Sequence, residues 1–171
     1  AATGPKSIAL AGEIADGWLA LFYSADQADE ALARIREGRA AAGKDIDGFD
    51  VVATVPIAAD DSAENAADRG RDYVALYVGG MGSREKNFYN DIAVRMGFPD
   101  EARLIQERYL AGDKAGARAA VPFELIDRTS LIGTVERMAE RMKDLADAGV
   151  TTLSLMLMDK QAPLEVKIKT L

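Results

Sequence analysis

The chain has 171 residues, 49% of them hydrophobic, and its 21 basic and 28 acidic side chains leave a formal charge of −7. This composition predicts one globular domain, and the negative charge disfavours binding to nucleic acid or to an anionic membrane surface. Cysteine and histidine are absent, which excludes disulfides and the usual metal ligands, so no metal site is expected. No apolar run approaches the roughly 20 residues that span a bilayer, and no signal-peptide pattern occurs. A cytoplasmic protein is expected.

The first sixty residues alternate helical and strand patterns. Pro5 suits the first position of a helix, and apolar residues recur at helical spacing until a predicted end near Asp16. The apolar residues 17–23 predict a strand that is buried on both faces, as in a parallel sheet. Residues 49–59, rich in β-branched side chains, predict the next strand. This alternation indicates βαβ units and therefore an α/β fold.

The helix between these two strands has both of its ends marked in the sequence. Ser24 and Gln27 have the spacing of a capping box, in which two side chains satisfy free N–H groups at the start of a helix. Gly43 is a suitable stop, because glycine accepts the left-handed conformation that commonly ends a helix. The predicted buried face of this helix carries apolar residues at helical spacing, namely Ala28, Ala31, Leu32 and Ile35.

Residues 60–149 predict a helical region interrupted by glycine and proline, including a turn at the glycines of residues 79–82. The last helix of this region is expected to begin after the cap Thr134 and to end at Gly149. Residues 150–158 then predict a third buried strand. One face of the last helix is expected to carry Val135, Met138, Met142 and Leu145.

The start of the first helix is a candidate anion site. Gly4 would let a ligand approach the backbone, and the N–H groups of Lys6 and Ser7, with the helix dipole behind them, favour an anion such as phosphate. The alternative is an ordinary turn into a helix with Pro5 at its first position.

A second candidate lies within residues 75–98, where an apolar helix runs into a glycine turn followed by asparagine and aromatic residues. Met81, Asn87 and Tyr89 could face a ligand there. The alternative is that Phe88, Ile92 and Met96 are simply the buried face of the next helix. Spacing alone leaves both interpretations open.

These stretches together resemble the C-terminal half of a luciferase-like monooxygenase family protein, in the branch that uses the deazaflavin coenzyme F-420 (F420). The resemblance is carried by GPKSIALAGEIADGWL, ALYVGGMGSREKNFYNDIAVRMGF, VPFELIDRTSLIGTVERMAERM and DAGVTTLSLM. It implies a fold class of α/β, the C-terminal part of a (β/α)8 TIM barrel covering residues 1–171, with a helical insertion at residues 60–149 before the last strand. Ala1 and Ala2 would then end the fifth strand. A barrel needs eight strands, so these residues are not expected to close one.

The resemblance also implies a function. In relatives, the loop that matches Thr3, Gly4, Pro5, Lys6 and Ser7 contacts the phosphate of the cofactor side chain, which agrees with the anion argument. The implied reaction is hydride transfer between the deazaflavin and a small organic substrate. Met81, Asn87 and Tyr89 stay candidates for the substrate pocket, and no catalytic acid or base is assigned.

Two other functions stay open at this point. The same fold could use FMN in a two-component monooxygenase. Alternatively, the chain could be a non-catalytic half-barrel that serves as a binding or assembly module. A homo-oligomer, or pairing with the remaining half of the barrel, is expected because apolar strand edges need cover, and the isolated chain is expected to be inactive.

Overall fold

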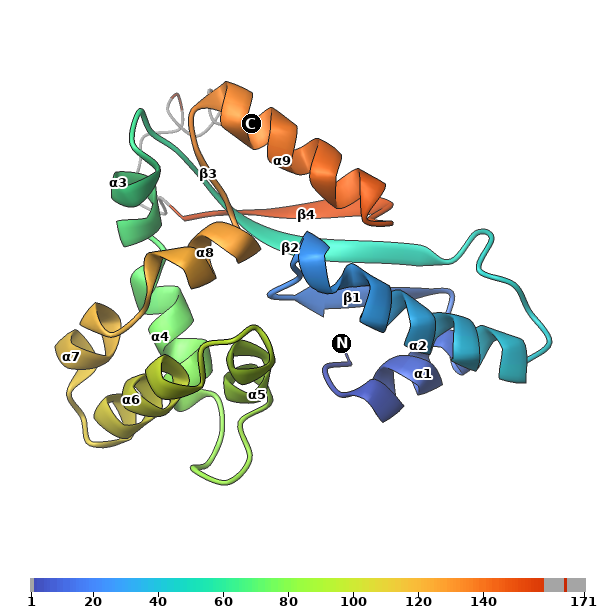
Figure 1. Ribbon diagram of the computed structural model, residues 1–171, viewed down its shortest axis with the longest axis horizontal. Coiled ribbons are helices and arrows are strands. Elements are labelled where there is room, and N and C mark those ends of the chain that lie inside the picture. The colour runs from blue at the N-terminus through green and yellow to red at the C-terminus, as the bar shows by residue number, and fades with distance from the viewer. Residues whose placement is uncertain (1, 159–164, 166–171) are drawn as a thin grey trace. The chain divides into compact units, whose positions relative to one another are not determined.

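The computed structural model describes residues 2–158 and residue 165, and its elements are labelled in Figure 1. The chain divides into two compact units. The first comprises Ala1–Val55 and Ala139–Leu155, and the second comprises Pro56–Met138 and Met156–Leu171. A strand end is predicted at Ala1 and Ala2; Ala1 lies outside the described residues, and Ala2 is not part of a strand.

The first unit begins with two helices that pack closely. Its first elements are α1 (Pro5–Ile14), β1 (Gly17–Leu21), the short 3-10 helix η1 (Ala25–Gln27) and α2 (Ala28–Ala41). A Cβ atom added at Gly38 would lie 1.8 Å from the carbonyl oxygen of Ala9, and one at Gly12 would lie 2.4 Å from that of Ile35. Both glycines therefore allow the backbones of α1 and α2 to approach each other. The predicted start near Pro5 and the stop at Gly43, whose φ is 69°, are confirmed.

The capping box predicted at Ser24 is wrong. One turn of η1 comes first, and α2 begins only at Ala28. The hydroxyl of Ser24 donates to the carboxylate of Asp26, and it caps no backbone N–H group of η1. The predicted buried face of α2 is confirmed for Ala28, Leu32 and Ile35, which are buried, whereas Ala31 is only half-buried.

The strands of the first unit are parallel, as predicted. β1 pairs with the first half of β2 (Asp50–Ala59), with Gly17 opposite Asp50 and Leu21 opposite Thr54. On β2, the carbonyl oxygen of Val51 accepts the N–H of Thr151, which directly precedes β4 (Thr152–Leu157). Figure 1 shows β1, β2 and β4 as labelled arrows.

The expectations that β1 is buried on both faces and that β4 is buried are wrong. Successive side chains of a strand point to opposite faces, and in β1 Trp18 and Ala20 are buried whereas 43% of Leu19 is exposed. No residue of β4 is buried. Among the described residues, helices cover one face of β1 and leave the face that carries Leu19 open.

The second unit contains a strand that sequence patterns did not reveal. β3 (Leu131–Gly133) pairs in parallel with the last three residues of β2, with Ile57 opposite Leu131. Three residues are too few to show a periodicity, and the surrounding sequence is helical. Pro56 lies between the β1 ladder, which ends at Thr54, and the β3 ladder, so its missing N–H breaks neither ladder.

The remaining elements are helices, as predicted for residues 60–149. They are α3 (Ala63–Asp68), α4 (Arg71–Gly80), α5 (Phe88–Arg95), α6 (Pro99–Leu110), α7 (Lys114–Ala119), α8 (Phe123–Thr129) and α9 (Val135–Asp147). The hydroxyl oxygen of Thr134 accepts the N–H of Arg137 at 3.3 Å, which confirms the predicted cap of α9. Met138 and Leu145 are buried, but 62% of Val135 is exposed, so this first-turn residue does not belong to the buried face.

The glycine turn predicted at residues 79–82 is only partly correct. Gly79 and Gly80 form the last turn of α4. A Cβ atom at Gly79 would lie 2.6 Å from the Cβ of Tyr109, and one at Gly80 would lie 2.2 Å from its ring. These two glycines therefore belong to a helix and let α6 pack closely against α4.

Candidate functional site

The predicted anion site lies where α1 begins. Gly4 is the N-cap residue, with extended backbone angles (φ −100°, ψ 156°), and Pro5 occupies the first helical position. The Ser7 hydroxyl oxygen accepts the Gly4 N–H at 3.1 Å, and the same hydroxyl donates to the Gly4 carbonyl oxygen at 2.9 Å. Ser7 therefore closes the first turn onto its own cap and fixes the conformation of Gly4.

The fold itself does not require glycine at position 4. A Cβ atom there would meet only the hydroxyl oxygen of Ser7, at an ordinary contact distance of 3.8 Å, and φ is negative. Pro5, Lys6 and Ser7 are exposed. The backbone at this helix end is therefore open to a ligand, and the first N–H groups of a helix have no partner within the helix.

Two aromatic residues follow α1 on and after β1. Trp18 lies in β1, is only 6% exposed, and its indole Nε1–H donates to the carbonyl oxygen of Ala2 at 2.9 Å. Tyr23 packs edge-on to it, with ring centroids 6.0 Å apart. The hydroxyl of Tyr23 donates to the carbonyl oxygen of Ala148 at 2.9 Å. Burial, and secondarily the charge of Asp29, raises the pKa of Tyr23 to about 12, so this hydroxyl keeps its proton at neutral pH.

The second group of predicted residues belongs to the second unit. Asn87 is the N-cap of α5 and is 3% exposed. Its side-chain oxygen accepts the N–H groups of Tyr89 and Asn90, and its amide nitrogen donates to the carbonyl oxygens of Tyr77 and Val78 at 3.0 and 2.8 Å. Both amide hydrogens and both oxygen lone pairs are therefore used within the protein.

Met81 and Tyr89 lie near the two ends of the loop between α4 and α5. Met81 directly follows α4 and is 50% exposed, while the ring of Tyr89 packs edge-on to Tyr77 with centroids 4.8 Å apart. The alternative interpretation is partly correct: Met96 is buried, but 61% of Phe88 is exposed. The structure therefore joins Asn87 to Tyr89 by a hydrogen bond and leaves Met81 on the surface.

A tyrosine pair that was not among the predicted site residues precedes this loop. Tyr73 and Tyr77 are one helical turn apart on α4, with ring centroids separated by 4.5 Å. Burial raises the pKa of Tyr73 and of Tyr89, and the neighbouring Tyr77 adds to both shifts. The i, i+4 spacing of these two aromatic residues was the available signal.

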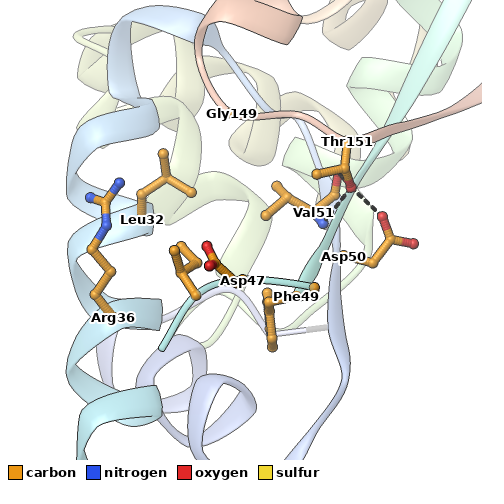
Figure 2. A pocket seen from close by; sticks show the side chains of 10 residues that line it. Leu32, Arg36, Asp47, Phe49, Asp50, Val51, Gly149 and Thr151 are labelled. Atoms are coloured by element: carbon orange, nitrogen blue, oxygen red, sulfur yellow. Dashed lines mark hydrogen bonds between the residues drawn. The ribbon is translucent and has the colours of Figure 1, made fainter. Parts of the chain in front are cut away.

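A pocket of about 510 Å³ lies in the first unit, at the amino ends of β2 and β4. Figure 2 shows Leu32, Asp47 and Val51 around it, and the Asp50 carboxylate accepting the hydroxyl of Thr151. In barrel enzymes the active site lies at the carboxyl ends of the strands. None of the predicted site residues lines this pocket. It is lined by Leu32, Arg36, Ile46, Asp47, Gly48, Phe49, Asp50, Val51, Gly149 and Thr151.

Among the helices that the structure describes, none is both long and apolar enough to cross a membrane. Residues 2–158 and 165 also contain no group of three or more Asp, Glu, His or Cys side chains placed to hold a metal ion.

Comparison with known proteins gives consistent matches. Residues 1–152 match the family described as luciferase-like monooxygenase. A Mycobacterium tuberculosis protein named as a coenzyme F420-dependent oxidoreductase is 34% identical over 154 residues, which cover 89% of this chain and 44% of that protein. The 5,10-methylenetetrahydromethanopterin reductase of Archaeoglobus fulgidus is 32% identical over 155 residues, covering 88% of this chain and 45% of the relative.

Solved structures agree with this result. The coenzyme F420-dependent tetrahydromethanopterin reductase from Methanopyrus kandleri matches with a TM-score of 0.77 and 27% identity, over 97% of this chain and 46% of that one. An F420-dependent secondary alcohol dehydrogenase, solved with an F420–acetone adduct, matches in fold with a TM-score of 0.66 and 17% identity, over 91% of this chain and 41% of that one. The predicted fold class, part of a (β/α)8 barrel, is confirmed. The chain spans about half the length of the relatives it matches.

Proposed function

The chain belongs to the luciferase-like monooxygenase family, and we propose that it forms part of an oxidoreductase that uses coenzyme F420 to reduce or oxidise a small organic substrate. The observation that carries this proposal is the match to a relative named for F420 dependence over 89% of the chain. The coenzyme, when bound, supplies a deazaflavin ring that carries hydride. The protein would hold the ring against the substrate and exclude water.

The proposed contribution of this chain is to bind the cofactor phosphate with the loop Thr3–Ser7. The residues present fit such a group, because a side chain is missing at Gly4 where the fold does not require glycine. The N–H groups of the first helical turn and the dipole of α1 favour an anion. Lys6 is exposed and can add an opposite charge.

For the substrate we propose only its class, a small organic molecule. One relative is named as a methylenetetrahydromethanopterin reductase, and one structural neighbour is named as a secondary alcohol dehydrogenase. Met81 and Tyr89 remain our candidates for the substrate side. The hydrogen bonds of Asn87 give it a structural role, and we propose that this residue acts by holding the loop before α5.

FMN is the second candidate cofactor, and the family description as luciferase-like monooxygenase is the observation that favours it. A flavin-dependent monooxygenase would bind FMN more tightly than F420 and would consume oxygen. Pairing of copies, or of this chain with the rest of the barrel, is a further proposal. It is motivated by the open face of β1 around Leu19.

The test uses the protein at its full natural length. Dissociation constants are measured for F420, for FMN and for the phosphate-free deazaflavin core of F420. We expect F420 to bind most tightly. Its advantage over the core, the ratio of the two dissociation constants, measures the contribution of the phosphate. Lys6→Ala is expected to reduce this advantage several-fold, because it removes a charge at the loop. Lys44→Ala, at another exposed lysine, is the matched control and should leave it unchanged.

Equal binding of F420 and its phosphate-free core would overturn the proposed phosphate site. Tighter binding of FMN, with oxygen consumption on reduction, would replace the F420 proposal with the monooxygenase function.

A further inference from the structure

The segment before α1 is tied to β1 by a buried indole. The Nε1–H of Trp18 donates to the carbonyl oxygen of Ala2 at 2.9 Å, and Trp18 is only 6% exposed. The acceptor lies two residues before Gly4. We propose that Trp18 is a positioning residue that holds the phosphate-binding loop Thr3–Ser7 in its binding conformation. This inference rests on the proposed function of that loop.

The loop is held from both ends. At its start, Ala2 is fixed to Trp18 on a strand that is hydrogen-bonded to β2. At its end, Ser7 exchanges two hydrogen bonds with Gly4. Thr3 is the only residue between these two attachments. Because only one residue separates the two attachments, the position of the indole and the hydrogen bonds of Ser7 together set the direction in which the backbone of Gly4 points.

The indole is well suited to this task. Tryptophan has a single side-chain donor and no acceptor, so the hydrogen bond to Ala2 uses its whole polar capacity. Its ring is buried on β1, and Tyr23 packs edge-on against it. The ring therefore holds the loop at a fixed place beside β1. An aliphatic residue at position 18 could fill the same space, but it would not hold the carbonyl of Ala2.

Removing this donor should weaken phosphate binding without removing a phosphate contact. In Trp18→Phe, the carbonyl of Ala2 would turn to water, and the loop would have to be ordered when the ligand binds. A neutral hydrogen bond contributes roughly 1 kcal/mol, so we expect the phosphate contribution to fall about fivefold.

Tyr23 offers a matched control. It neighbours Trp18 and also donates one hydrogen bond to a backbone carbonyl at 2.9 Å, but its acceptor is Ala148, outside the loop. Tyr23→Phe keeps the ring and removes only the hydroxyl. Both variants are expected to lose similar stability, whereas only Trp18→Phe should change the response to phosphate.

The experiment measures dissociation constants of F420 and of its phosphate-free deazaflavin core for the wild type, Trp18→Phe and Tyr23→Phe, in the full-length protein. The dissociation constant of the core divided by that of F420 measures how much the phosphate-bearing part of the cofactor adds to binding. We expect the ratio to fall about fivefold in Trp18→Phe and to stay at the wild-type value in Tyr23→Phe. Trp18→His, which keeps a ring N–H, should recover part of the loss.

Nuclear magnetic resonance of the wild type gives a test that does not depend on a variant folding. The indole N–H signal of Trp18, assigned by selective labelling, should shift when F420 is added and not when the phosphate-free core is added. A wild-type ratio near one would refute the proposed phosphate site itself. A large wild-type ratio that Trp18→Phe leaves unchanged, or that Tyr23→Phe lowers equally, would refute the positioning role alone, as would an indole signal unmoved by F420.

Discussion

Replacing Gly38 by alanine tests the packing that supports the candidate site. The new Cβ would lie 1.8 Å from the carbonyl oxygen of Ala9, whereas an ordinary contact begins at 3.4 Å. The atom in its way is backbone, so α1 would have to move away from α2 by more than an ångström. That movement would loosen the packing around Ile35, which is completely buried.

The two opposing energies can be compared. Alanine is favoured over glycine within a helix by about 1 kcal/mol, and this gain would stabilise α2. Overpacking costs about 1–3 kcal/mol when side chains can adjust, and more when they cannot. Because backbone is displaced here, we expect a cost of about 3–4 kcal/mol and therefore a net loss of about 2–3 kcal/mol, or roughly 5–10 °C in Tm for a chain of this size.

Urea and thermal unfolding, followed by circular dichroism, measure this loss. Gly4→Ala is the matched control, because its Cβ would meet only the hydroxyl oxygen of Ser7, at 3.8 Å; we expect its stability to stay within about 0.5 kcal/mol of the wild type. A Gly38→Ala protein as stable as the wild type would refute the close approach of α1 and α2.

Two further predictions concern other parts of the chain. Asn87→Ala removes the cap of α5, leaves the Tyr77 carbonyl without this donor and leaves the Val78 carbonyl with the Asn90 amide alone, so we expect about 2–3 kcal/mol of destabilisation in urea unfolding, and Asn87→Ser, which keeps a cap oxygen without adding a charge, should recover part of it. Because the folded state raises the pKa of Tyr23 to about 12, the proton is bound more tightly in the folded protein. The contribution of the protonated Tyr23 side chain to the free energy of unfolding should be intact below pH 10 and lost between about pH 10 and 12. Urea unfolding measured at several pH values should show a smaller loss of stability above pH 10 in Tyr23→Phe than in the wild type. An equal loss in both proteins would contradict the raised pKa of Tyr23.

Local sequence signals predicted the elements that neighbouring residues define. Pro5 marks the start of α1, Thr134 caps α9, and Gly43 and Gly149 end their helices with positive φ. Each of these signals depends on the backbone conformation of a single residue or on a hydrogen bond between residues that are three positions apart. The resemblance to F420-dependent relatives also came from the sequence, through motifs spread over the chain.

Interactions between distant segments decided the remaining features. Residues 131–133 are too few to show a strand pattern, yet they form β3 by pairing with the end of β2. Gly79 and Gly80 resemble a turn, but they lie in α4, where Tyr109 of α6 leaves no space for a side chain. Such outcomes depend on which partner is nearest in space, and spacing along the chain does not contain that information.

The candidate phosphate loop illustrates both contributions. Gly4, Pro5 and Ser7 fix the start of α1 from the sequence alone, because proline sets φ and the serine hydroxyl lies within reach of the cap. The hydrogen bond from Trp18 to Ala2 spans sixteen residues and exists only because β1 folds back beside the start of α1. The sequence by itself therefore determined that a helix begins at Pro5, and the tertiary structure decided what holds that helix end in place.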